Sequence, residues 1–201
     1  MAVTKTVPVE RIREAYDCGL RVFGENRVQE AVWKYPGLPS DIELHFIGPL
    51  QSNKVKFLPG LAQWVQSIDR VQIAEKLAAR YREQGEQIVQ VLIELNTSGE
   101  PSKHGFLTAE QALEAADAII ELEGLELRGA MTIGPLTGGE RLIRTAFARL
   151  RGFFEVLQAK YPDRRIDTLS MGMSDDFEIA IEEGATMVRP GSVIFGSREP
   201  L

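Results

Sequence analysis

Short apolar runs alternate with longer stretches in which apolar residues recur at helical spacing along the whole chain. Some of the short runs are apolar at nearly every position, notably residues 89–93 and 193–195. Parallel strands that helices cover on both faces have this composition. The pattern therefore predicts strands at residues 2–5, 20–24, 43–48, 64–68, 88–95, 127–133, 168–172 and 187–195.

Start and stop signals bound the helical stretches between these strands. Pro8 suits the first position of a helix that ends at Gly19, and a run after Asp69 ends at Gly85. Thr108 with Gln111 predicts a capping box at the start of another helix. Further helices are expected over residues 142–160 and after the cap at 174–176.

About eight strands alternating with helices predict a single (β/α)₈ TIM barrel that spans residues 1–201. An open, doubly wound sheet is the alternative. The sequence lacks a dinucleotide-binding glycine motif, and this absence favours the barrel.

The charge and the cysteine content narrow the class of protein. A net charge of −6 and a pI near 5.1 argue against nucleic acid as a partner. Cys18 is the one cysteine, so no intramolecular disulfide can form, which fits a reducing compartment. The sequence shows no signal peptide and no apolar run of membrane-spanning length, so a soluble cytoplasmic protein is expected. Its histidines, His45 and His104, are too few for a typical zinc site, and no metal is expected.

Polar residues gather where the predicted strands end, which is the face that carries the active site in barrels of this kind. Residues 170–174 lead into a helix N-terminus, where N–H groups favour an anion. Residues 189–192 follow at the eighth strand. The loops after strands seven and eight are the usual phosphate site of this fold, so the two stretches together predict one.

Lys5 closes the first apolar run and should point toward the mouth of the barrel. A partly desolvated lysine loses its proton more readily and can attack an aldehyde. A lysine beside a phosphate site calls for an aldehyde ligand that carries a phosphate.

Several strings, in order along the chain, resemble the pyridoxal phosphate (PLP) homeostasis proteins, a family with a fold like the N-terminal domain of alanine racemase. They are AVTKT at 2–6, FGENRVQE at 23–30, HFIGPLQSNK at 45–54, NTSGE at 96–100 with Lys103 and Gly105, LSMGMSDD at 169–176, and residues 189–198. The resemblance covers essentially the whole chain, and several of the strings are long and specific.

The resemblance implies a set of cofactor contacts. They are Lys5 as the aldimine with PLP, Asn26 near the 3-oxygen of the ring, His45 near the ring or the pocket wall, Ser170 and Met171 with the backbone of Gly191 and Ser192 at the phosphate, and Arg189 at the pyridine nitrogen. An arginine at that nitrogen disfavours its protonation and weakens the ring as an electron sink. The alternative for Arg189 is an ion pair with a carboxylate.

The sequence departs from the family pattern in two places. Family members begin with a helix ahead of the first strand, and this chain lacks it. The seam between the first and eighth strands is therefore expected to be uncovered, through truncation, or to be covered by a second copy. Pro190 stands where an aliphatic residue is expected, and proline cannot donate a backbone hydrogen bond.

The predicted function is a PLP carrier in intracellular vitamin B6 homeostasis, without robust catalysis. PLP-dependent apo-enzymes are the candidate recipients, and the chain is expected to be a monomer or a weak homo-oligomer. One alternative is a PLP-dependent amino-acid racemase, which needs a second acid/base across the ring. The tyrosines all fall in predicted helices or loops away from the strand ends: Tyr16, Tyr35, Tyr81 and Tyr161. The other alternative is a Schiff-base sugar-phosphate lyase with Glu25 as the acid/base, although Glu25 is expected to pair with a lysine at the mouth.

Overall fold

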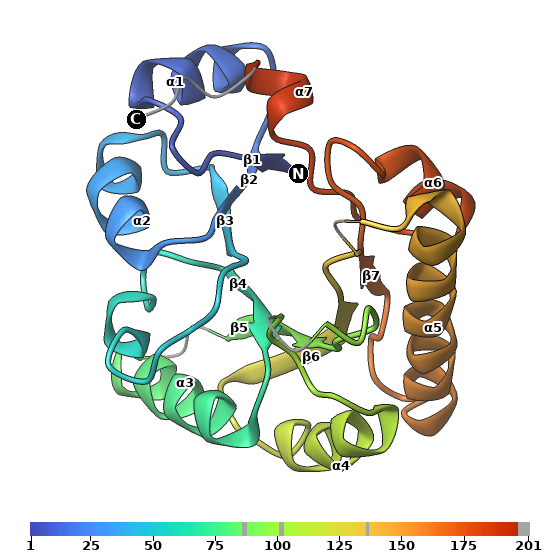
Figure 1. Cartoon of the computed structure of the whole chain (residues 1–201). Coiled ribbons are helices and arrows are strands. Elements are labelled where there is room, and N and C mark those ends of the chain that lie inside the picture. The colour runs from blue at the N-terminus through green and yellow to red at the C-terminus, as the bar shows by residue number, and fades with distance from the viewer. Residues whose placement is uncertain (86–87, 101–102, 136, 197–201) are drawn as a thin grey trace.

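A computed structural model describes residues 1–85, 88–100, 103–135 and 137–196. Seven parallel strands follow the chain in the order β1-β2-β3-β4-β5-β6-β7 and curl into a ring, with the longer helices outside it (Figure 1). The strands are β1 (Ala2–Val3), β2 (Val22–Glu25), β3 (Glu43–Phe46), β4 (Trp64–Ile68), β5 (Val89–Glu94), β6 (Leu125–Met131) and β7 (Thr168–Ser170). This is the predicted (β/α) barrel, and the open doubly wound sheet is wrong.

Each strand is linked to the next by a helix or a helical turn that packs outside the ring. The helices are α1 (Val9–Asp17), α2 (Val28–Lys34), α3 (Val71–Glu83), α4 (Ala109–Ile119), α5 (Gly139–Lys160), α6 (Phe177–Glu182) and α7 (Ser192–Phe195), with short 3₁₀ turns η1 (Tyr35–Gly37) and η2 (Val55–Phe57). None of these helices is long and apolar enough to cross a membrane.

The prediction of an eighth strand over residues 187–195 is wrong in its second half, where α7 forms. The first half still closes the ring, because the N–H of Met171 donates to Met187 O at 3.1 Å and the N–H of Val3 donates to Pro190 O at 2.9 Å. Pro190 can accept but not donate, so the ladder cannot continue on both sides. The chain turns at Gly191, whose carbonyl accepts the N–H of Phe195 at 2.9 Å.

The main core lies between the sheet and the helices. Val89, Val91 and Ile93 on β5 are fully buried, as the continuous apolar pattern of this strand predicts. One of the two hydrogen bonds of the capping box predicted at α4 is present, since Thr108 Oγ1 accepts the N–H of Gln111 at 3.2 Å.

Helix α2 was not predicted, although its buried face includes Val28, Ala31 and Lys34. The burial of a lysine there conceals the apolar stripe that would identify the helix.

Candidate functional site

A cavity of about 260 Å³ opens where the strands end. Five of the eight predicted cofactor contacts line it, namely Lys5, Asn26, Arg189, Gly191 and Ser192. The remaining walls come from Val3, Ile47, Gly48, Pro49, Ile133, Met173, Ser174 and Asp175. Residues from both ends of the chain thus meet at one face of the barrel.

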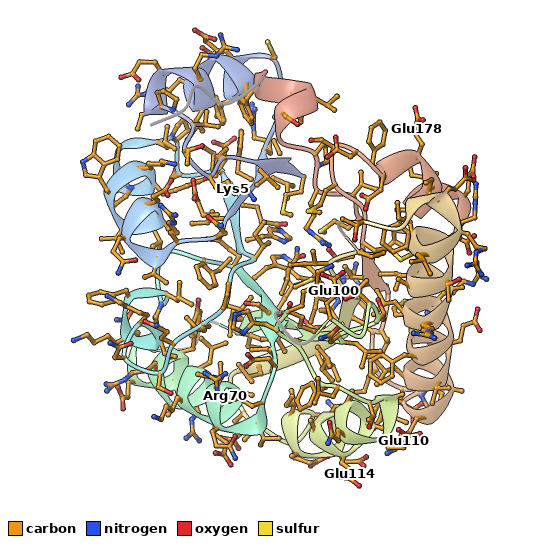
Figure 2. The ribbon with its side chains drawn as sticks, viewed as in Figure 1. Lys5, Arg70, Glu100, Glu110, Glu114 and Glu178 are labelled. Carbon is orange, nitrogen blue, oxygen red and sulfur yellow. The ribbon has the colours of Figure 1, made fainter. Side chains whose placement is uncertain are left out.

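Lys5 stands in a tight turn directly after β1, beside the opening of the ring (Figure 2). The N–H of Val7 donates to Thr4 O at 2.9 Å and closes this turn. Thr6 has φ 63°, a left-handed conformation that costs a non-glycine residue of the order of 1 kcal/mol. Its N–H donates to Glu30 Oε2 at 2.8 Å, which offsets that strain. The turn therefore fixes the direction in which the backbone presents Lys5.

A buried polar network supports this turn from below. Lys34 Nζ donates to Thr4 O at 2.8 Å, to Glu25 Oε1 at 2.8 Å and to Glu30 Oε2 at 2.7 Å. Thr4 Oγ1 also donates to Glu25 Oε1 at 2.8 Å. Burial raises the pKa of Glu25, and its bonds from Lys34 and Thr4 oppose that rise. The expected pairing of Glu25 with a lysine is confirmed, but the pair lies beneath the cavity and Glu25 does not line it.

The expectation that every tyrosine lies away from the strand ends is wrong for Tyr35. Its hydroxyl lies 2.8 Å from Thr4 Oγ1, next to the strand-end turn. Tyr35 is buried and does not line the cavity, and burial raises the pKa of its phenol. The sequence conceals this placement because Tyr35 reaches β1 from the end of α2, an element that was not predicted.

Asn26 forms one wall and is packed against the turn after β3. Its side-chain Oδ1 is buried without a hydrogen-bond partner in the described part of the chain. Gly48 lies against its backbone, and a Cβ at position 48 would stand 2.0 Å from Asn26 O. Only a glycine lets the two strand ends approach this closely.

We expect Gly48→Ala to lower the free energy of unfolding by about 1–3 kcal/mol, because a rigid backbone atom would have to move. The matched control is Gly37→Ala, since a Cβ there meets nothing within 4 Å. Urea denaturation of both variants measures the difference. Equal stabilities would contradict the close approach of Gly48 to Asn26.

Arg189 is the charged group at the inner end of the cavity, with only 4% of its surface exposed. Its guanidinium donates to Ser170 Oγ and to Thr132 O, both at 2.7 Å. No carboxylate lies within ion-pair distance of it in the described chain, so the alternative of an ion pair is wrong. Burial lowers the pKa of Arg189 to about 10, and the charges of Glu94 and Asp176 oppose that fall. Arg189 is therefore a cation at neutral pH.

The other predicted contacts, His45, Ser170 and Met171, lie behind the cavity rather than on it. The hydroxyl of Ser170 accepts from Arg189 and donates to Gln66 Oε1 at 2.7 Å. Gln66 in turn bonds to His45 Nδ1 at 2.7 Å, so a hydrogen-bonded chain inside the barrel holds Arg189 in place. Met171 is fully buried in the core, and its N–H is bonded to Met187.

The loop after β7 and the turn before α7 form the opposite wall. Ser174 Oγ accepts the N–H of Gly191 at 3.0 Å and that of Val193 at 3.4 Å, which ties the two segments together. Within the described chain, the backbone N–H groups of Ser174, Asp175 and Ser192 have no acceptor. Ser174 belongs to the 170–174 stretch that was predicted to favour an anion, whereas Asp175 was predicted only as a helix-capping residue. The position of their loop after the seventh strand was the available signal that they belong to the site.

Glu94, at the end of β5, is a buried carboxyl that the sequence did not single out, with 3% of its surface exposed. Burial raises its pKa to about 7; the charge of Asp69 adds to this rise and that of Arg189 opposes it. The folded protein therefore holds this proton more tightly than the unfolded chain. The protonated carboxyl of Glu94 therefore stabilises the folded state fully below the pKa that it has in the unfolded chain, and this stabilisation is lost as the pH rises toward 7.

We expect the wild-type free energy of unfolding to fall by up to about 3 kcal/mol through this group between about pH 4.5 and pH 7. Glu94→Gln should remove that part of the pH dependence. Above this pH range, the variant should be more stable than wild type. Urea denaturation across this pH range is the measurement. An unchanged slope in the variant would mean that Glu94 is not the titrating group.

Residues 1–199 match the family described as "Alanine racemase, N-terminal domain". The chain is 46% identical to the pyridoxal phosphate homeostasis protein of Aquifex aeolicus, over 99% of this chain and 86% of that protein. It is 45% identical to the protein of the same name from Escherichia coli K12, over 99% of this chain and 85% of that protein.

The chain also resembles proteins of known structure. PipY of Synechococcus elongatus with PLP bound has a TM-score of 0.87 and 36% identity, covering 98% of this chain and 91% of PipY. Its structure without PLP has a TM-score of 0.92. An alanine racemase from Clostridium difficile has a TM-score of 0.82 at 14% identity, a likeness of fold that covers 99% of this chain and 52% of the racemase.

Proposed function

This chain belongs to the family of the alanine racemase N-terminal domain, among the pyridoxal phosphate homeostasis proteins, and on that premise we propose that it binds PLP through Lys5 and serves vitamin B6 homeostasis in the cytoplasm. The observation that carries the proposal is one cavity in which a lysine, a buried arginine and backbone N–H groups without acceptors converge. Each of the three suits a different part of this ligand.

The residues fit PLP in their chemistry. The N–H groups of Ser174, Asp175 and Ser192 belong to residues that line the cavity, and a phosphate accepts such bonds. Asn26 has an amide oxygen without a partner, and a rotation of that amide would present N–H groups instead, which can donate to a ring oxygen. When bound, PLP supplies an aldehyde for the lysine amine and a pyridine ring that can withdraw electrons.

Arg189 favours storage over catalysis. Two hydrogen bonds to neutral oxygens fix its guanidinium, so its positive charge is not neutralised by a paired carboxylate. A cation at the pyridine nitrogen disfavours protonation there and leaves the ring a weak electron sink. We therefore propose that the site retains PLP without strongly activating it.

The cavity also lacks the groups that the two alternatives need. Among the described lining residues the titratable side chains are Lys5, Asp175 and Arg189. Tyr35 and Glu25 lie beneath the cavity, and Glu25 is held by Lys34. Neither can serve as the second acid/base of a racemase or as that of a sugar-phosphate lyase without leaving its buried partners.

PLP-dependent apo-enzymes are the proposed recipients of the cofactor, with the chain acting as a monomer or a weak homo-oligomer. The test of PLP binding is the visible absorption spectrum of the purified protein with added PLP, followed by borohydride reduction and peptide mass analysis. A band that borohydride removes, with the added mass on the peptide that contains Lys5, supports the proposal. If the added mass lies instead on a peptide that contains another lysine, the proposal is overturned. Amino-acid racemisation at rates typical of enzymes would overturn the storage role.

A further inference from the structure

A second cavity, of about 430 Å³, adjoins the first across Asn26 and Pro49. The proposed function does not use it. Three segments that carry the family resemblance meet there: the start of α2 supplies Arg27, the turn after β3 supplies Lys54, and the loop after β5 supplies His104. Arg70, from the end of β4, completes the lining, and Figure 2 shows it beside α3.

The lining is positively charged in a protein whose net charge is −6. Among the lining residues, Arg27, Lys54 and Arg70 face a single carboxylate, that of Asp69, which leaves an excess of two positive charges before His104 is counted. Asp69 is paired with Arg70 at 2.7 Å. Arg27 has only a longer ion pair, 3.6 Å, with Glu30. No carboxylate lies within ion-pair distance of Lys54 in the described chain. The cavity is therefore an attractive place for an anion.

Hydrogen bonds hold the guanidinium of Arg70 and the backbone of Lys54 in place. The guanidinium of Arg70 donates to Leu50 O at 3.0 Å and so joins the segments that follow β3 and β4. The N–H of Lys54 donates to Gln51 O at 2.9 Å, and Lys54 O accepts from Phe57 at 3.1 Å. A ligand would find the positions of these groups largely formed, which lowers the entropy cost of binding.

Apolar groups form another part of the wall: the ring of Pro49 is exposed there, beside Val28, Phe46 and Leu50, which are almost fully buried. Phosphate alone would leave the Pro49 ring and the methylene chain of Lys54 without a partner, whereas a hydrocarbon chain would cover them. The volume is that of a small-molecule site. We propose that this cavity binds a small organic acid, with the carboxylate at Lys54, Arg27 and Arg70 and the aliphatic part against the apolar wall. This site does not depend on Lys5 or on PLP.

The test compares three probes on the full chain, with PLP removed and with PLP added. 4-Methylpentanoate carries both the charge and the hydrocarbon, inorganic phosphate the charge alone, and 4-methylpentan-1-ol the hydrocarbon alone. Affinities come from calorimetry or from NMR chemical-shift titration. We expect the acid to bind more tightly than either of the others, and its affinity to fall as the ionic strength rises.

Lys54→Gln should weaken the binding of the acid by about tenfold, the effect of losing one charged hydrogen bond. Lys56→Gln is the matched control, because it removes the same charge from the same turn and Lys56 does not line the cavity. Equal affinities in the two variants, or no binding of the acid, would overturn the proposal. The proposal would also be overturned if phosphate bound as tightly as the acid and its binding depended equally on Lys54. Failure here leaves the PLP absorption band unchanged, so this result is separate from the test at Lys5.

Discussion

In Lys5→Ala, we expect the absorption band of protein-bound PLP to disappear and borohydride to leave no PLP on the protein. Lys5 is the one lysine among the described residues that line the cofactor cavity. The turn that presents it is fixed by hydrogen bonds to Glu30 and Thr4. The expected effect is all-or-none rather than a fractional loss.

Lys5→Arg separates the covalent bond from the charge. Its guanidinium keeps the positive charge but is too weak a nucleophile at neutral pH to condense with an aldehyde. This variant should also lack the band, while retaining more noncovalent affinity for PLP than Lys5→Ala. Equilibrium dialysis with PLP measures that affinity. A full band in either variant would assign the covalent bond to another amine and would refute the proposed role of Lys5.

The barrel could be predicted because its signal is repeated. Several strands covered by helices carry apolar residues at successive positions, and β5 shows this most clearly, with Val91, Leu92 and Ile93 all buried. The sequence-based prediction fails where a single residue interrupts the apolar pattern of a strand or helix. Pro190 stops the eighth strand before α7, and buried Lys34 interrupts the apolar face of α2.

The lining of the site was harder to predict than its place in the fold. Lys5 and Arg189 stand at the cavity as expected, whereas His45 and Ser170 lie deeper in the barrel. Ser170 bonds directly to Arg189, and His45 is linked to Ser170 through Gln66. Side chains alternate between the two faces of a strand, so a sequence can indicate which face a residue occupies. It does not indicate how far along the barrel axis the residue lies, and that depth decides whether it contacts the ligand or a ligand-binding residue.

Lys34→Met should lower the free energy of unfolding by about 3–5 kcal/mol at neutral pH, because it leaves the carboxylate of Glu25 buried without a cation. Methionine keeps most of the volume of lysine, so the loss is chiefly electrostatic. The variant also removes the hydrogen bond to Thr4 O, which supports the turn of Lys5. The affinity for PLP should therefore fall as well. Urea denaturation and PLP titration measure the two effects.

The double variant Lys34→Met/Glu25→Gln tests whether the buried charge of Glu25 causes the loss of stability in Lys34→Met. A neutral amide at position 25 needs no cation, so the double variant should recover most of the stability that Lys34→Met loses. The burial that already raises the pKa of Glu25 should raise it further once Lys34 is gone. Since a raised folded-state pKa favours the folded state at low pH, the deficit of the single variant should shrink as the pH falls. A deficit that persists at low pH, and in the double variant, would mean that Lys34 acts through packing rather than charge.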